Sequence, residues 1–360
     1  MKRLTASLAF TLLFGGAVLA QNVPALQNVS AEEKARLEAL IEGAKKEGQL
    51  SYLDTVVQPT TNDQLVAAFR KHYGLPSSFR VNYALSATGS LVTRVEQELS
   101  AGRVTTDVVS IASPTWVFER IKAGHVLEYK SPEYKHYQKV FEQGLGLDGY
   151  FAFNGGYIFV PMWNSEKLDF KGTSLKDVIG AVPASRISVG DVGKSTSYLA
   201  TYVGQREKVD EKFFKDLAAM KPTFLVRSEQ IAGRLVTGED LMAFSGMPTR
   251  AYQYNQKGAK LKFMLPKEGV VLLPQNQFIL AKAPHPNAAK LWIDFVLSAE
   301  GQAILTKNEA MISGRSGFKS PLPEYAPSID DLNLIKVDWQ GTTSAKLKEL
   351  RDGWVSTFNP

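Results

Sequence analysis

The first half of the chain alternates between short apolar segments typical of strands and amphipathic segments typical of helices. The expected strands are 50–54, 79–85 and 107–112, and the expected helices are 62–73, 90–100 and 114–123. An earlier helix begins with the capping box Ser30-Ala31-Glu32-Glu33 and ends near Gly48. Because strands that alternate with helices pair in parallel and are covered on both faces, the sequence predicts an α/β fold with mostly parallel sheets.

The second half of the chain repeats this alternation, with strands expected at 186–191, 223–227, 241–245 and 260–265. It follows the apolar strand 151–164, in which Gly155-Gly156 suits a hinge, and segment 269–305 is expected to return to the first lobe. A chain of 360 residues exceeds the usual size of one core. We therefore predict two lobes with a ligand cleft between them, joined by two hinge strands. The predicted boundaries are 21–155 plus 270–310 and 156–269 plus 311–360.

The N-terminus has the features of a secretory signal peptide. Lys2 and Arg3 precede an apolar run from Leu4 to Leu19, and small residues end it at Ala20. The run is shorter than the ~20 apolar residues that a membrane span needs. We expect a signal peptide at 1–20 and a periplasmic mature chain that does not span the membrane.

Charge and cysteine content exclude several classes of partner and site. The chain has 42 Lys and Arg against 36 Asp and Glu, and removing Lys2 and Arg3 leaves 40 against 36. This small, dispersed excess argues against nucleic-acid binding. The absence of cysteine excludes disulfides, thiolate metal sites and a lipid-modified anchor. A freely diffusing monomer is expected.

Hydroxyl and amide side chains cluster where each first-lobe strand ends and the next helix begins. The three clusters are Gln58-Pro59-Thr60-Thr61-Asn62, Ser86–Ser90 and Ser113-Pro114-Thr115. Such residues are also ordinary helix caps, so one cluster alone indicates little. Because the carboxyl ends of parallel strands open on one edge of a sheet, the three together predict a polar pocket.

The stretch VGDVGKSTSYLA, residues 189–200, contains Gly193-Lys194-Ser195, which resembles the end of a phosphate-binding P-loop. A P-loop needs a glycine five positions before the glycine of this triplet, and Ser188 stands there. A helix N-terminus is the simpler interpretation, because its free N–H groups and hydroxyls suit an anion and Lys194 adds charge. An ordinary capped helix is the alternative.

Five segments resemble the extracellular solute-binding proteins of ABC importers, in the branch that includes ferric-iron, phosphosugar and phosphonate binders. They are EGQLSYLDT, TGSLVTRVEQELSAGRVTTDVVSIAS, IKAGHVLEYKSPEY, LPKEGVV and AKAPHPNAAKLWIDFVLSAEGQAIL. They occur in the family's order along nearly all of the mature chain. The resemblance implies a type II-like periplasmic-binding-protein fold, an inner-membrane ABC permease as partner and no cofactor. A sensor subunit that presents its closed form to a signalling receptor is an alternative.

The iron-binding members of this branch hold Fe(III) chiefly through two adjacent tyrosines shortly before a Lys-Gly pair. Counted back from Lys257-Gly258, the matching stretch is Met247-Pro248-Thr249-Arg250, which has no tyrosine. Tyr252 and Tyr254 are near, but their spacing places them on different faces of a helix. No metal site is therefore predicted, and ferric iron remains the alternative ligand.

The expected ligand is a small organic anion that bears a phosphate, phosphonate or carboxylate. Hydroxyls and N–H groups at helix starts suit such oxygens, and Arg250 can add a two-pronged contact. The predicted ligand-binding residues are Asp54, Gln58, Ser86, Thr88, Gly89, Ser90, Ser113, Lys194, Ser195, Thr196, Ser197, Thr249, Arg250 and Asn276.

Enzyme motifs are missing from the sequence. None of the histidines, His72, His125, His136 and His285, lies in HExxH or at metal-ligand spacing, and GxSxG is absent. The acidic pair Glu239-Asp240 points in two directions on any regular element. No catalytic residue is predicted, and an exported hydrolase is the less favoured alternative.

Overall fold

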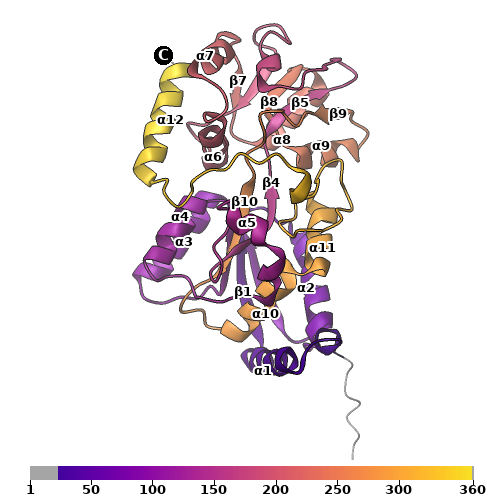
Figure 1. The fold of residues 1–360 in the computed structure, drawn as a ribbon, viewed down its shortest axis with the longest axis vertical. Helices are drawn as coiled ribbons and strands as arrows, with labels where there is room; N and C mark the ends of the chain where they lie inside the picture. Colours follow the sequence, from indigo (N-terminus) through magenta and orange to yellow (C-terminus); the bar gives the residue numbers. More distant parts are fainter. Residues whose placement is uncertain (1–22, 359–360) are drawn as a thin grey trace, which may run out of the picture.

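Two five-stranded sheets, each flanked by helices, form two lobes of an α/β fold (Figure 1). The structure is a computed structural model that describes residues 23–358, so the predicted signal peptide lies outside the described residues. The two-lobed α/β fold predicted from the sequence is confirmed. Within residues 23–358, no helix has the length and apolar character needed to cross a bilayer.

The sheet of the first lobe has the order β2-β1-β3-β10-β4. β1 runs parallel to β2 and β3, whereas β10 runs antiparallel to β3 and β4. β4 and β10, which run antiparallel to each other, are the strands that connect to the other lobe. The strand bounds are β1 Gln49–Asp54, β2 Arg80–Leu85, β3 Val108–Ile111, β4 Ala152–Tyr157 and β10 Leu273–Ile279.

Helices cover both faces of this sheet. Tyr52 and Phe278 point to opposite faces, because they pair with consecutive residues of β3. Trp292 of α10 packs on Tyr52 with ring centroids 5.2 Å apart, and Trp116 of α4 packs on Phe278 at 6.1 Å. The α10 face carries α1 Ala31–Glu47, α2 Pro59–Tyr73, α10 Pro286–Leu297 and α11 Ala299–Glu309; the other carries α3 Thr88–Ser100 and α4 Pro114–Lys122.

The second lobe repeats this plan in the order β7-β6-β8-β5-β9. β6 is parallel to β7 and β8, and β5 is antiparallel to β8 and β9. Its strands are β5 Val160–Asn164, β6 Ile187–Gly190, β7 Thr223–Leu225, β8 Met242–Gly246 and β9 Leu261–Phe263. Its helices are α6 Thr196–Gln205, α7 Glu211–Ala219, α8 Ser228–Thr237, α9 Pro248–Asn255 and α12 Ser344–Phe358, which packs on α6 and α7.

Three segments of the chain connect the lobes. β4 continues into β5 through Ile158 and Phe159, and residues 264–272 lead from β9 back to β10. These are the two hinge connections that the sequence predicted. A third connection, residues 310–343, leads from α11 to α12 and passes the short helix α5 Gln138–Glu142, where the Lys139 ammonium donates to the carbonyl of Ile329 at 2.8 Å. Short 3-10 helices occupy Pro24–Leu26, Pro132–His136, Leu175–Val178 and Ile329–Asp331.

The sequence predicted a hinge at Gly155 and Gly156, but in the structure these glycines do not form the crossing between the lobes. Both lie inside β4, where a Cβ on Gly155 would be 2.8 Å from Met311 and one on Gly156 2.7 Å from Leu272. The two glycines therefore make room for neighbouring side chains. The break in the strand comes at residues 158–159 instead.

A buried carboxylate joins α1 to α10 on the first lobe. Asp294 accepts hydrogen bonds from the Arg36 guanidinium at 2.9 Å, the Tyr129 hydroxyl at 2.8 Å and the Ser131 hydroxyl at 2.6 Å. Burial raises the pKa of Asp294 to about 6, although Arg36 and the hydroxyls favour its charged form. The stability of this lobe should therefore depend on pH.

Candidate functional site

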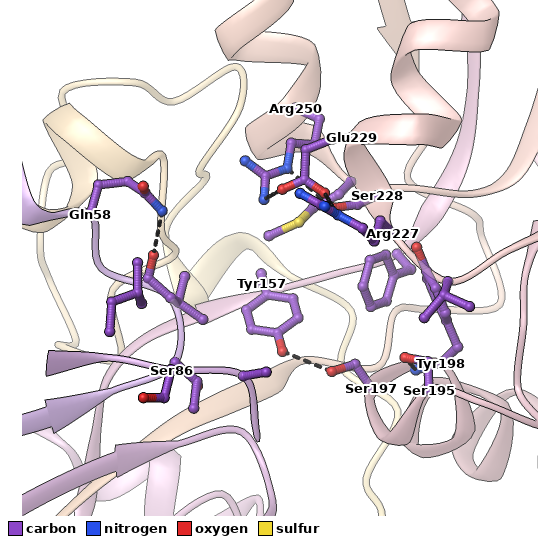
Figure 2. A pocket seen from close by; sticks show the side chains of 17 residues that line it. Gln58, Ser86, Tyr157, Ser195, Ser197, Tyr198, Arg227, Ser228, Glu229 and Arg250 are labelled. Carbon is purple, nitrogen blue, oxygen red and sulfur yellow. Dashed lines mark hydrogen bonds and ion pairs between the residues drawn. The ribbon is translucent and has the colours of Figure 1, made fainter. Parts of the chain in front are cut away.

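A cavity of about 430 Å³ lies between the lobes, where strands of both sheets end. Figure 2 shows Gln58 and Ser86 on the first-lobe side, Ser195, Ser197 and Arg227 on the opposite side, and Tyr157 between them. A volume of this size suits a small organic molecule and greatly exceeds that of a bare metal ion.

The first-lobe wall is formed by the residues that follow β1 and β2. Ala87 is the N-cap of α3, and no side chain caps this helix end. The first helical bond runs from the Leu91 N–H to the carbonyl of Ala87, so the three N–H groups before Leu91 lie outside the helical ladder. Ser86 and Ala87 line the cavity beside them. The start of α3 therefore borders the cavity, although Thr88, Gly89 and Ser90, which carry these N–H groups, do not line it.

Two carboxylates of the protein itself bind the loop that leads into α2. Asp54 accepts from the N–H groups of Val56 at 2.6 Å and Val57 at 2.9 Å, and Glu309 accepts from the N–H of Gln58 at 2.8 Å. Burial raises the pKa of Glu309. Asp54 is fully buried. These carboxylates oppose the binding of an anion beside the start of α2.

The second-lobe wall contains the starts of three helices. Ser195 is the N-cap of α6, and its hydroxyl accepts from the N–H of Tyr198 at 3.4 Å. The hydroxyl of Ser197 is 3.2 Å from that of Tyr157 on β4, which links the two lobes directly. The starts of α8 and α9 complete this wall.

Three charged side chains line the cavity, and all come from the second lobe. Arg250 of α9 forms an ion pair with Glu229 of α8 and donates to the Ser228 hydroxyl at 3.1 Å (Figure 2). Arg227 lies 3.7 Å from Glu229, and 70% of its side chain is exposed. Two cations against one anion give the lining an excess of one positive charge, which favours an anionic ligand.

Two tyrosines line the cavity, and burial raises the pKa of both Tyr157 and Tyr198. Their phenols therefore stay protonated and can donate hydrogen bonds to an anion. The Tyr198 hydroxyl is buried and has no hydrogen-bond partner among the described residues. Within residues 23–358, no cluster of three or more His, Cys, Asp and Glu side chains is placed to hold a metal ion.

Residues 104–330 match the family described as bacterial extracellular solute-binding proteins. The chain belongs to this family. Solute-binding proteins of this kind serve ABC importers and act by binding, so the family is not one of enzymes. A search of the curated proteins found no match.

Solved structures of other solute-binding proteins share the fold at low sequence identity. A substrate-binding protein of an ABC transporter from Agrobacterium tumefaciens has a TM-score of 0.73 at 14% identity, over 86% of this chain and 94% of its own. Iron-bound HitA from Pseudomonas aeruginosa has a TM-score of 0.68 at 16% identity, over 85% and 99%. AfuA from Actinobacillus pleuropneumoniae, with fructose 6-phosphate bound, has a TM-score of 0.68 at 21% identity, over 86% of this chain and 98% of its own. Proteins of this fold thus include binders of quite different solutes.

The structure of this solute-binding protein brings part of the predicted site together. The predicted residues that line the cavity are Gln58, Ser86, Ser195, Ser197 and Arg250. Those outside its lining are Asp54, Thr88, Gly89, Ser90, Ser113, Lys194, Thr196, Thr249 and Asn276. Lys194 pairs with Asp191 at 3.5 Å and stays exposed, whereas Thr249 and Asn276 are buried. Tyr252 also lies away from the cavity, where its hydroxyl donates to the carbonyl of Lys307 at 3.4 Å.

Sequence reasoning missed the residues at the start of α8. It also missed three aromatic side chains that line the cavity, Tyr157, Phe159 and Tyr198. The predicted strand 223–227 already implied that the residues after it face the cleft, as those after 79–85 do, so this signal was present. The aromatic residues had no such signal, because their apolar surroundings are typical of core. The missed lining residues are Thr55, Val56, Leu85, Ala87, Tyr157, Phe159, Tyr198, Val226, Arg227, Ser228, Glu229 and Met247.

Replacement of Gly190 by alanine is expected to displace Tyr198. A Cβ on Gly190, the last residue of β6, would lie 2.3 Å from the Tyr198 ring. Such overpacking costs about 1–3 kcal/mol, which urea unfolding would measure, and ligand affinity should fall with it. Gly353→Ala is the matched control, because a Cβ there meets nothing within 4 Å. Unchanged stability of Gly190→Ala would contradict the close packing of Tyr198.

Proposed function

We propose that this protein captures a small organic anion in the cavity between its lobes and delivers it to an inner-membrane ABC permease. It would act in the periplasm after cleavage of a signal peptide, as a monomer without a cofactor. The observation that carries the proposal is the convergence of Arg227, Arg250 and the uncapped start of α8 on one cavity. Helix starts and guanidinium groups both favour phosphate, phosphonate and carboxylate oxygens.

Capture depends on contacts from both lobes. The ligand's anionic group would lie between Gln58 and Ser86 of the first lobe and the two arginines of the second. A ligand favours the closed state only through contacts that are stronger there than in the open state. The crossing segments at 158–159 and 264–272 would bend as the lobes close.

Binding without turnover fits the chemistry of the cavity. Among residues 23–358, no histidine lines it, and Glu229 is the one carboxylate that does, already paired with Arg250. Hydrolysis needs a base close to a nucleophile, and the lining hydroxyls have no such base. This supports a binding protein over an exported hydrolase.

Ferric iron is the second candidate, because Tyr157 and Tyr198 both line the cavity. Burial raises the pKa of both tyrosines, so a bound ferric ion would have to displace the protons of their phenols. The lining also lacks a carboxylate free of an ion pair. The organic anion therefore remains the favoured ligand.

The test is a thermal-shift panel on protein that has been unfolded and refolded to remove any bound solute. The panel contains methylphosphonate, phenylphosphonate, fructose 6-phosphate, citrate, ferric citrate and spermidine. A ligand at 100 times its dissociation constant adds about 2.7 kcal/mol of stability, so a specific organic anion should raise the melting temperature. A response to ferric citrate alone, with a phenolate charge-transfer colour, would overturn the proposal.

A further inference from the structure

Two exposed apolar side chains belong to the cavity lining, one from each lobe. Leu85, the last residue of β2, is 39% exposed, and Val226, directly after β7, is 45% exposed. Both line the cavity. Large apolar residues this exposed are few among residues 23–358; the others are Val29, Leu265 and Val355, and none lines the cavity.

The apolar lining extends beyond this pair. Val56 lies on the first-lobe wall, Met247 lies on the second, and Phe159 lies on the segment between the lobes. The rings of Phe159 and Tyr198, which both line the cavity, pack with centroids 4.4 Å apart. The cavity thus combines a group of apolar side chains with hydroxyl groups and two arginines.

Because apolar surface gains by leaving water, this lining favours a ligand that has an apolar part as well as an anionic one. A metal ion would leave Leu85 and Val226 in contact with water. A sugar phosphate would bring hydroxyl groups against them and lose part of its hydration without new hydrogen bonds. An apolar body between the two walls would be covered from both lobes when the cavity closes.

We propose that the ligand is an organic anion with a compact apolar body, aromatic or branched aliphatic, which Leu85 and Val226 cover from opposite sides. The inference rests on the proposed function, because Arg227 and Arg250 must hold the anionic group. Leu85 and Val226 are then specificity-determining residues, which select for the body and do not bind the charge.

The experiment compares two phosphonates that differ in the apolar body, by calorimetric titration of the refolded protein. Phenylphosphonate is expected to bind at least about tenfold more tightly than methylphosphonate, because the ring buries additional apolar area. Leu85→Ser and Val226→Ser should each reduce this preference several-fold, because each should lower the affinity for phenylphosphonate more than the affinity for methylphosphonate. A matched carboxylate pair, phenylacetate and acetate, should behave in the same way.

The controls are Leu265→Ser and Val355→Ser, which replace side chains of similar exposure, 43% and 40%, away from the cavity. Both should leave the preference for the phenyl compound intact. Equal binding of the two phosphonates, or tighter binding of fructose 6-phosphate than of phenylphosphonate, would overturn the inference while anion binding stands. Failure of every anion to bind would remove the proposed function with it.

Discussion

Replacement of Arg250 by alanine is expected to weaken the binding of an anionic ligand by about ten- to a hundredfold. A hydrogen bond to a charged group contributes about 1.5–3 kcal/mol, and each 1.4 kcal/mol is about tenfold in affinity. The change also removes the excess positive charge of the cavity lining, because Glu229 then balances Arg227. Calorimetric titration with the best anion of the panel measures the effect.

Glu229→Gln tests the same effect of cavity charge on anion affinity, in the opposite direction. It removes the negative charge that faces both arginines and so should tighten binding of the same anion. Arg206→Ala is the control for loss of a second-lobe arginine, because Arg206 packs over Tyr202 outside the cavity. If Arg250→Ala and Arg206→Ala bind equally well, the placement of the anion beside Arg250 is wrong.

The stability contributed by Asp294 is expected to decline as the pH rises from about 4 to above 6. Burial raises its pKa from 3.8 to about 6, so the folded state holds this proton more tightly than the unfolded state. The contribution is fully present below pH 3.8 and is lost as the pH rises through 6. The shift corresponds to a change of about 3 kcal/mol in the free energy of unfolding across this pH range.

Urea unfolding of the wild type and of Asp294→Asn at several pH values isolates this effect, because asparagine does not titrate. The wild type should lose stability relative to the variant across this range. Arg36 keeps its second carboxylate partner in the variant, since Glu33 accepts from its Nη2 at 2.7 Å. Parallel stability curves between pH 4 and 7 would contradict the raised pKa of Asp294.

Local pattern in the sequence was sufficient for most of the fold. The alternation of strand and helix signals between residues 50 and 123 depends on side-chain periodicity and helix capping, both of which act within a few residues. The predicted strands 50–54 and 79–85 correspond to β1 and β2, and the cap Ser30 does accept a hydrogen bond from the Glu33 N–H. Gly155-Gly156 shows the limit, because the sequence does not reveal that Met311 and Leu272 fill the space beside them.

The sequence by itself determined the two-lobed α/β fold and the rule that ligand groups gather where strands end, because both follow from local periodicity and strand direction. Only the tertiary structure decided which of those ends face a ligand. Glu309, far along the chain, occupies the start of α2, whereas Glu229 and Arg250 come together from different helices. Such contacts depend on how distant segments pack, which periodicity does not encode.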